Sequence, residues 1–373
     1  MKIAVVAHIR HAISQPYKGG MESHCHMLCD GLRRRGHDVT LFAAGGSSDD
    51  CLVPICDAPY EQVLPWNVYR GSSRLADYQR DAFEQVLLNV GAGGFDVVHN
   101  NSLFPELMDW FAAAGVPCVT SQHVPPFEAM VQAVIRSTRK SGNVVTCTSA
   151  DQQRIWDERG FEDTRVVPNG VDTSKWQPAR EVADFFTWVG RIVPNKGLAE
   201  AVAAARMAGI SMRIFGPIED VPYFVDRVEP LLGQGVEYHG HQTFEQLRDQ
   251  LCRAAAAVVT PMWDEPFGLV AAEALSCGVP VVGFDRGALR EVVGDCGVLV
   301  EAGDVAALSE GMARVGEIDR ELCRQRAVTQ LSIEAMIDGY EQCYEAAVSG
   351  ARISSLARLC WSSRAPRTTA LLA

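Results

Sequence analysis

Short apolar runs rich in β-branched residues alternate with longer stretches of helical periodicity along the whole chain of 373 residues. The first series of expected strands covers residues 2–9, 38–44, 95–101, 117–123 and 143–149. The second series covers residues 184–191, 211–217, 236–241, 255–262 and 280–285. Alternation of strands and helices is typical of parallel sheets with helices on both faces. The pattern therefore predicts two doubly wound α/β domains that face each other across a cleft.

The polar segment Pro168–Arg180 separates the two series and is the expected hinge, because it carries Pro and Gly and little hydrophobic character. We predict an N-terminal domain over residues 1–170 and a C-terminal domain over residues 171–335. Residues 336–349 are expected to form a helix that returns toward the N-terminal domain, and residues 350–373 a basic tail. Ligands bind beyond the carboxyl ends of strands in such sheets, so the loops after strands are the expected sites.

The composition of the chain narrows the possible classes of protein further. The net charge of −12 argues against a general nucleic-acid binder. The twelve cysteines show no CxxC pairs, which favours a reduced, cytoplasmic protein, and the apolar N-terminus is too short for a signal segment. The basic tail is expected to be disordered or loosely docked, and the basic loop Ile135–Asn143 to be solvated. For both, the alternative is a peripheral contact with an anionic lipid surface.

Two loops of the N-terminal half draw attention. Gly19 and Gly20 follow the first strand and precede a helix, so backbone N–H groups can approach a ligand there, although a plain turn explains the pair equally well. The dinucleotide pattern GxGxxG is absent at this position, which weakens a dehydrogenase interpretation. His24 and His26 stand two apart on the predicted helix. They point to different sides, so we expect them on its surface and not at a shared metal.

The C-terminal half holds stronger signals. Arg191 and Lys196 bracket a tight loop between a strand and a helix, and two cations beside free helix N–H groups predict a phosphate site. In "WDEPFGLVAAEALSCG", Glu265 lies at the loop and Glu273 about two turns into a helix. A buried glutamate needs a polar partner, so each is expected to meet a ligand or a donor. Eight helical residues would separate their backbones by roughly 12 Å, which favours two subsites over one acid–base pair.

Together these segments resemble the retaining glycosyltransferases of family 4, which have the GT-B architecture of two Rossmann-like parallel-sheet domains. The resemblance spans about residues 1–345. It is specific because several motifs occur together: "GGMES", "VVPNGVD", "VGRIVPNKG", the Glu-x7-Glu motif from Glu265 to Glu273, and "EALSCGVPVVGFDRGALREVV". The resemblance implies transfer of a hexose-type sugar from a nucleotide-diphosphate sugar, expected to be a UDP-sugar, to an acceptor hydroxyl. The acceptor is a small molecule, a glycan or a lipid-linked molecule.

The same resemblance implies the roles of individual residues. Arg191 and Lys196 would clamp the diphosphate and stabilise the departing negative charge. Glu273 would bind the ribose hydroxyls, and Glu265 would contact the donor sugar. The backbone N–H groups that assist Glu265 would be those of Phe267, Gly268 and Leu269.

On the opposite domain, the resemblance places Gly20 against the phosphates after closure and His123 near the reacting sugar. The implied mechanism is front-face, with the leaving phosphate taking the acceptor proton, and it needs no metal and no cofactor. Gly287 and Glu291 keep the family's spacing, so an anion site at that helix start is expected, although Ala288 replaces a usual glycine. Asn100 and Asn101 follow His99 where a second histidine is common, which weakens a proton relay on that side.

Two alternatives keep the fold and change the function. The first is another GT-B reaction, either an epimerase or a glycan phosphorylase; a phosphorylase would need a pyridoxal-phosphate lysine. The second is a nucleotide-sugar-binding protein that has lost turnover. Release of a nucleoside diphosphate from labelled sugar nucleotides separates these alternatives from a transferase.

Overall fold

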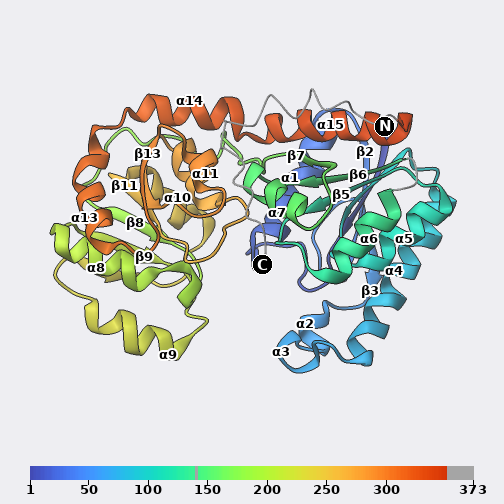
Figure 1. The fold of residues 1–373 in the computed structure, drawn as a ribbon, viewed down its shortest axis with the longest axis horizontal. Coiled ribbons are helices and arrows are strands. Elements are labelled where there is room, and N and C mark those ends of the chain that lie inside the picture. Colours follow the sequence, from blue (N-terminus) through green and yellow to red (C-terminus); the bar gives the residue numbers. More distant parts are fainter. Residues whose placement is uncertain (139–141, 351–373) are drawn as a thin grey trace, which may run out of the picture.

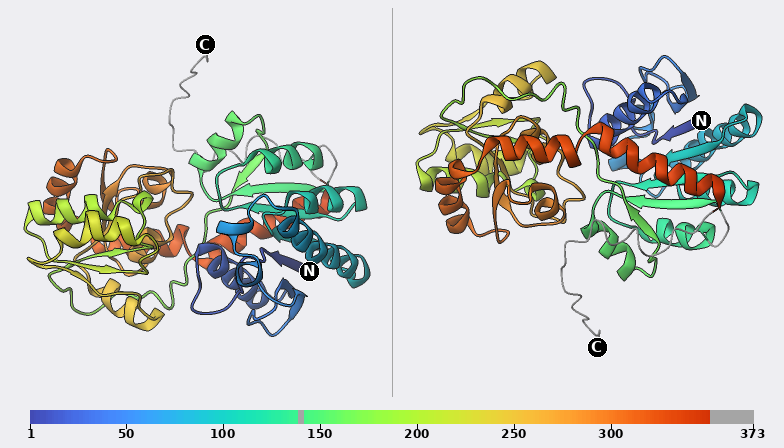
Figure 2. Two further views of the ribbon diagram at one scale, coloured as in Figure 1. Left: turned by 90° about the horizontal axis from the view of Figure 1, so that it is seen from below. Right: turned by 90° about the horizontal axis from the view of Figure 1, so that it is seen from above.

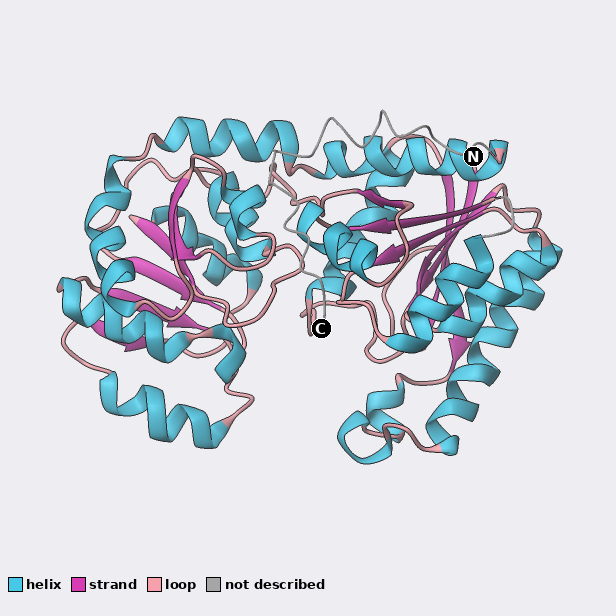
Figure 3. Ribbon diagram, viewed as in Figure 1, coloured by secondary structure: helices cyan, strands magenta, loops and turns pink. Residues whose placement is uncertain are grey.

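The computed structural model describes residues 1–138 and 142–350, so most of the basic tail and part of the basic loop lie outside the described residues. It contains two parallel sheets, each sandwiched between helices, in two domains that lie side by side (Figures 1 and 3). The predicted fold of two doubly wound parallel-sheet domains is therefore confirmed. No helix among the described residues combines the length and the hydropathy needed to cross a bilayer.

The N-terminal sheet has seven strands in the order β3-β2-β1-β4-β5-β6-β7. Its strands are β1 (Lys2–Ala7), β2 (Asp38–Ala44), β3 (Leu52–Cys56), β4 (Val97–Asn101), β5 (Cys118–Gln122), β6 (Asn143–Cys147) and β7 (Thr164–Val166). The helices around it are α1 (Gly20–Arg34), α2 (Tyr60–Val63), α3 (Trp66–Tyr69), α4 (Ser73–Gly93), α5 (Pro105–Ala114), α6 (Glu128–Thr138), α7 (Ala150–Glu158) and α15 (Ile333–Ser349).

Strand β1 shows why these residues form a central strand. Ile3 and Val5 pack into the core under α1 and α15, whereas Ala4 and Val6 pack into the core on the α4 and α5 face. Successive side chains of a strand point to opposite faces, so a continuous apolar run satisfies a sheet that is buried on both sides.

The C-terminal sheet has six strands in the order β10-β9-β8-β11-β12-β13. Its strands are β8 (Phe186–Val189), β9 (Met212–Phe215), β10 (Val236–Tyr238), β11 (Ala256–Val259), β12 (Val281–Phe284) and β13 (Gly297–Val300). Its helices are α8 (Leu198–Ala208), α9 (Val221–Tyr223), α10 (Phe244–Arg253), α11 (Leu269–Ser276), α12 (Leu289–Val293), α13 (Val305–Arg314) and α14 (Arg320–Gln330).

Three of these strands, β3, β7 and β13, were not predicted from the sequence. Strand β3 is an edge strand that contains Pro54, and β7 has only three residues. Strand β13 lies at one edge of the C-terminal sheet and begins with Gly297. Edge strands tolerate Pro and short length because one side of the backbone needs no partner, so their sequence signal is weak.

The chain crosses between the domains twice, and the two crossings run side by side. Val171 donates a backbone hydrogen bond to Leu331 O at 2.8 Å and accepts one from Ile333 N at 3.1 Å. A Cβ atom on Gly170 would lie 2.6 Å from Ile333 Cα, so this close approach requires glycine. After the second crossing α15 lies along the N-terminal domain and packs against α1, as the view from above shows (Figure 2).

Candidate active site

The candidate site in the C-terminal domain is built by the loops that follow β8 and β11, which are neighbouring strands. Lys196, in a 3-10 turn after β8, places its Nζ atom 2.6 Å from Oε2 of Glu265 in the loop after β11. Trp263 Nε1 donates to the same carboxylate oxygen at 2.9 Å, and the Lys196 ammonium lies 5.5 Å from the Trp263 ring centroid. Two predicted site residues therefore meet, and Glu265 neutralises Lys196 directly.

Backbone contacts hold these two loops together. Thr260 Oγ1 donates to Gly197 O at 2.9 Å, and Met262 N donates to Asn195 O at 2.9 Å. Gly197 has φ +67°, and a Cβ atom there would lie 2.0 Å from Thr260 O. Only glycine allows both the left-handed backbone and this close approach, so the glycine of "NKG" fixes where Lys196 points.

Arg191, the other predicted cation, lies at the surface beside the carboxyl end of β8. Its Nη1 atom is 2.9 Å from Oε2 of Glu219, and both side chains are largely exposed. The structure thus gives each predicted cation a carboxylate partner of its own. An exposed pair of this kind contributes little, about 0–1 kcal/mol, so a ligand phosphate can displace Glu219 at small cost.

Glu273 lies in the second turn of α11 and is half-buried. Its carboxyl accepts no hydrogen bond from any residue that the structure describes, and burial raises its pKa to about 8. A carboxyl without donors in this setting is ready to accept hydroxyl donors from a ligand. The segment between Glu265 and Glu273 is helical only from Leu269, so the 12 Å separation expected from a continuous helix does not apply.

The start of α11 presents backbone N–H groups. Gly268 precedes the helix with φ +91°, and within the described part of the chain the N–H groups of Phe267, Gly268 and Leu269 find no acceptor. Such groups at a helix start attract negative or polar ligand atoms. The anion site expected at the start of α12 stays a prediction, but the backbone N–H group of Ala288 cannot contribute to it. Ala288 N donates to Glu265 O at 2.9 Å, so its N–H group is already used.

The N-terminal domain brings the glycine pair to α11. A Cβ atom on Gly20 would lie 2.9 Å from Leu269 Cδ1, so the first turn of α1 touches the first turn of α11. Beneath it, His8 Nε2 is 3.3 Å from Glu22 Oε1, and both side chains are buried. Burial alone would raise the pKa of Glu22, but the interaction with His8, together with smaller contributions from its own backbone N–H group and His11, outweighs burial and holds the pKa below its usual value.

His123 directly follows the carboxyl end of β5 in the N-terminal sheet. Its Nε2 atom lies 3.2 Å from Asn101 Oδ1, so Nε2 carries the proton toward the amide oxygen and leaves Nδ1 as an acceptor. Burial, together with the charge of His8, lowers the pKa of His123 to about 4, which keeps the imidazole neutral near pH 7. Its ring centroid lies 4.2 Å from that of His24.

The expectation that His24 lies on a helix surface is wrong, because its side chain is 1% exposed. His8, Glu22 and His24 were not predicted as parts of the site. His8 directly follows β1, so position after a strand was the signal that could have found it, whereas Glu22 lies in the first turn of the helix that begins at Gly20.

Below the same histidines, a buried network ties α15 to the N-terminal sheet. His99 Nδ1 lies 2.6 Å from Tyr344 Oη, and His99 Nε2 lies 2.8 Å from Ser121 Oγ. Burial lowers the pKa of His99 to about 3, so it is neutral and one ring nitrogen donates while the other accepts. This network holds α15 against β4 and β5, and His123 directly follows β5.

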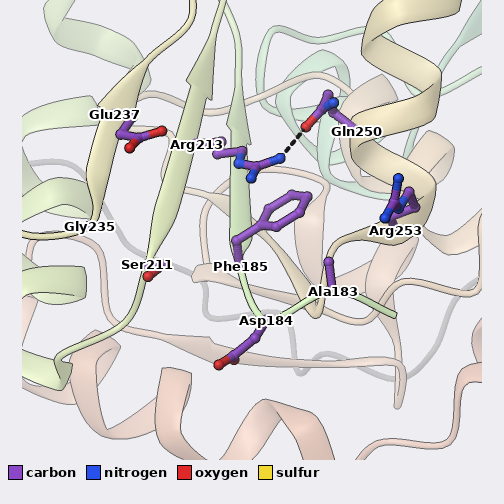
Figure 4. A pocket seen from close by; sticks show the side chains of 9 residues that line it. All are labelled: Ala183, Asp184, Phe185, Ser211, Arg213, Gly235, Glu237, Gln250 and Arg253. Atoms are coloured by element: carbon purple, nitrogen blue, oxygen red, sulfur yellow. Dashed lines mark hydrogen bonds between the residues drawn. The ribbon is translucent and has the colours of Figure 1, made fainter. Parts of the chain in front are cut away.

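A cavity of about 490 Å³ lies elsewhere, at the amino ends of β8, β9 and β10 (Figure 4). There the Arg213 guanidinium lies 3.9 Å from the Phe185 ring centroid and donates to Gln250 Oε1 at 2.6 Å. The cavity lies at the amino ends of these strands, whereas Lys196 follows the carboxyl end of β8. This cavity is therefore separate from the candidate site.

No group of three or more His, Cys, Asp or Glu side chains among the described residues is arranged to hold a metal ion. The candidate site has Lys196, Glu265, Glu273 and free helix N–H groups on the C-terminal domain. The N-terminal domain brings Gly20 into contact with Leu269 and carries His123 after β5. Two doubly wound domains that meet at loops after the carboxyl ends of their strands form the two-domain architecture that the sequence predicts.

Comparison with known proteins gives the family. The profile described as "Glycosyltransferase Family 4" matches residues 18–175, and that of "Glycosyl transferases group 1" matches residues 183–317. The D-inositol 3-phosphate glycosyltransferase of Xylanimonas cellulosilytica is 30% identical over 353 residues, covering 78% of this chain and 82% of the relative. The glycogen synthase of Mycobacterium tuberculosis is 26% identical, covering 90% and 92%.

Among solved structures, AviGT4, a glycosyltransferase involved in avilamycin A biosynthesis, superposes with a TM-score of 0.71 at 26% identity. The match covers 94% of this chain and 98% of AviGT4. The chain belongs to the family 4 glycosyltransferases, and it transfers a sugar from a nucleotide sugar.

Proposed function

We propose that this enzyme is a retaining hexosyltransferase that needs no metal and takes a UDP-sugar as donor. The observation that carries the proposal is the meeting of Lys196 and Glu265 at a distance of 2.6 Å near the start of α11. A cation, a carboxylate and unpaired N–H groups at one helix start match a ligand that carries both a diphosphate and a sugar.

The donor exchanges partners with this pair. Its diphosphate takes the Lys196 ammonium and releases the Glu265 carboxylate, which then accepts hydrogen bonds from hydroxyls of the donor sugar. Arg191 leaves the exposed carboxylate of Glu219 to complete the phosphate contacts. Electrostatic stabilisation of the leaving diphosphate is then supplied by two cations and by the start of α11.

Glu273 receives the nucleoside. Its carboxyl has no donor in the described part of the chain, and two ribose hydroxyls supply what it lacks. Binding of these hydroxyls favours the carboxylate and lowers the raised pKa. In this proposal Glu273 binds the ribose and takes no part in breaking or forming bonds to the sugar.

The acceptor enters from the N-terminal domain. His123, neutral and oriented by Asn101, faces the sugar and holds it by a hydrogen bond without taking the acceptor proton. The acceptor hydroxyl attacks from the side that the diphosphate leaves, and its proton passes to a departing phosphate oxygen. The sugar configuration is retained because attack and departure share one face. Relatives named for glucans and inositol phosphate support a hydroxyl-rich acceptor.

The test is turnover of defined donors. UDP-, GDP- and ADP-sugars are incubated with glycan, inositol phosphate and lipid-linked acceptors, and release of nucleoside diphosphate is measured with and without EDTA. We expect release with a UDP-sugar, unchanged by EDTA, and a product with the anomeric configuration of the donor by NMR. A product of inverted configuration, or activity lost with EDTA, would contradict the proposal.

A further inference from the structure

The two domains are joined at the first turn of α7 in the N-terminal domain. Glu291 of α12 accepts hydrogen bonds from Ala150 N at 2.8 Å and from Asp151 N at 3.1 Å, one on each carboxylate oxygen. Ser149 Oγ accepts from the next N–H group, that of Gln152, at 3.1 Å. A helix start has N–H groups without partners inside the helix. Here a carboxylate of the opposite domain satisfies two of them.

A second bond crosses the boundary two residues before this turn. Thr148 Oγ1 donates to Pro266 O at 2.8 Å, and the Thr148 side chain is buried. Pro266 directly follows Glu265 and precedes Phe267 in the loop that forms the candidate donor site. The N-terminal domain therefore holds the backbone of this loop directly.

On the C-terminal side, both contacts belong to one connected unit. Ala288 N, at the start of α12, donates to Glu265 O at 2.9 Å. Gly287 packs so closely on the same loop that a Cβ atom would lie 2.3 Å from Glu265 N. A shift of α12 relative to α7 thus carries the backbone of Glu265 with it. The contact between Gly20 and Leu269 lies at the other end of the loop.

We propose that Thr148 and Glu291 are positioning residues for sugar transfer. They hold the Glu265–Leu269 loop against the N-terminal domain, so that a sugar bound by the loop faces His123 and the acceptor. This inference rests on the proposed function and adds a role to it. Glu291 does this from α12, through its two hydrogen bonds with the first turn of α7.

The consequence is a separation between donor binding and transfer. The predicted contacts to the nucleotide, Lys196 and Glu273, belong to the C-terminal domain alone, so loss of the interdomain bonds leaves nucleotide affinity nearly unchanged. Transfer needs both domains in register, because a misplacement of about 1 Å costs about a hundredfold in rate. We expect kcat to fall about tenfold or more while the Kd for UDP changes less than about threefold.

The experiment uses the full chain and the variants Thr148→Val and Glu291→Gln, with Thr148→Ser as the rescue. Thr243→Val is the matched control, because Thr243 caps α10 within one domain, with its Oγ1 atom 3.4 Å from Gln246 N. UDP affinity is measured by calorimetry, and kcat and donor KM by nucleoside diphosphate release. Hydrogen exchange at Ala150 and Asp151 reports the contact itself without requiring turnover.

The expected result is faster exchange at Ala150 and Asp151 in Glu291→Gln, lower kcat in both variants, and near-normal kcat in Thr148→Ser and Thr243→Val. Equal kcat in wild type, Thr148→Val and Glu291→Gln would overturn the inference while leaving the proposed function intact. If kcat fell equally in Thr243→Val, the inference would also be overturned. Loss of a helix cap within one domain would then be enough to explain the fall in Thr148→Val and Glu291→Gln. Wild-type protein that turns over no sugar nucleotide would instead overturn the proposed function, and with it this inference.

Discussion

The ammonium of Lys196 and the carboxylate of Glu265 lie 2.6 Å apart although they are 69 residues apart in the chain. Both side chains keep some exposure, 23% and 15%, so the pair is neither sealed in the core nor free in solvent. A partly exposed pair holds both groups in place and still exchanges partners with a ligand. The resting site is thus nearly neutral at the point where a diphosphate is expected to bind.

Lys196→Met tests the role of the cation. Methionine keeps much of the side-chain volume and removes the charge that stabilises the leaving diphosphate. We expect kcat/KM to fall about a hundred- to a thousandfold, the range seen when one electrostatic contact to developing charge is removed. Nucleoside diphosphate release under steady-state conditions measures it. Lys175→Met is the control, since Lys175 is an exposed lysine in the segment between β7 and β8 and pairs with Asp172 at 3.4 Å.

Glu265→Gln separates the two tasks of the carboxylate. In the resting enzyme Glu265 competes with phosphate for Lys196, so its neutralisation is expected to tighten binding of free UDP about three- to tenfold, or roughly 0.6–1.4 kcal/mol. Transfer should fall, because the donor sugar loses an acceptor for its hydroxyls. Calorimetry with UDP and turnover with the UDP-sugar give the two readouts. Weaker UDP binding in Glu265→Gln would show that the pair does not oppose the phosphate.

Gly197→Ala tests the close approach of the two loops. At Gly197 a new Cβ atom meets Thr260 O at 2.0 Å, whereas at Gly209, with nearly the same backbone at φ +68°, it meets nothing within 4 Å. Gly209→Ala therefore isolates the cost of the left-handed backbone, about 1–2 kcal/mol. We expect Gly197→Ala to cost roughly 1–3 kcal/mol more by crowding. Denaturant unfolding of both variants measures the difference, and equal losses would contradict the structure.

The sequence predicts the architecture well, because buried parallel strands are apolar runs that local periodicity reveals. It predicts Lys196 and Glu265 as site residues because each lies in a loop after a strand, and Glu273 because a carboxylate in an apolar helix needs a polar partner. It does not predict that Lys196 and Glu265 touch. That contact depends on β8 and β11 being neighbours, although β9 and β10 come between them in the chain. Strand order in a doubly wound sheet leaves little local signature, so the pairing appears only in three dimensions.

The interdomain contacts escape prediction for a related reason. Glu291 keeps a family spacing, which predicts an anion site at the start of its helix and gives no sign of a contact with the other domain. Its carboxylate instead reaches Ala150 and Asp151, about 140 residues away. His8 and Glu22 are similar, since either residue alone has an ordinary setting and only burial of both makes them a pair. Long-range burial of polar groups is a property of the assembled fold.

Glu273 makes the stability of the enzyme depend on pH. Its pKa in the folded protein is raised to about 8 from an ordinary value of 4.5, so the folded form binds more protons than the unfolded chain between these values. The contribution of Glu273 to stability is therefore present at low pH and is lost as the pH rises toward 8, by at most about 1.4 kcal/mol per pH unit. Denaturant unfolding of wild type and Glu273→Gln over this pH range measures how the free energy of unfolding changes with pH. The part of that dependence that Glu273 contributes should be absent in the variant.

The same carboxyl links donor binding to proton release. If ribose hydroxyls donate to Glu273, binding stabilises its carboxylate, so UDP binding near pH 7 should release close to one proton and tighten as the pH rises. Calorimetry in two buffers of different ionisation enthalpy counts that proton. Glu273→Gln should abolish the release and weaken UDP about ten- to a hundredfold, the loss of one to two hydrogen bonds to a charged group. Equal proton release in the variant would place the ribose elsewhere.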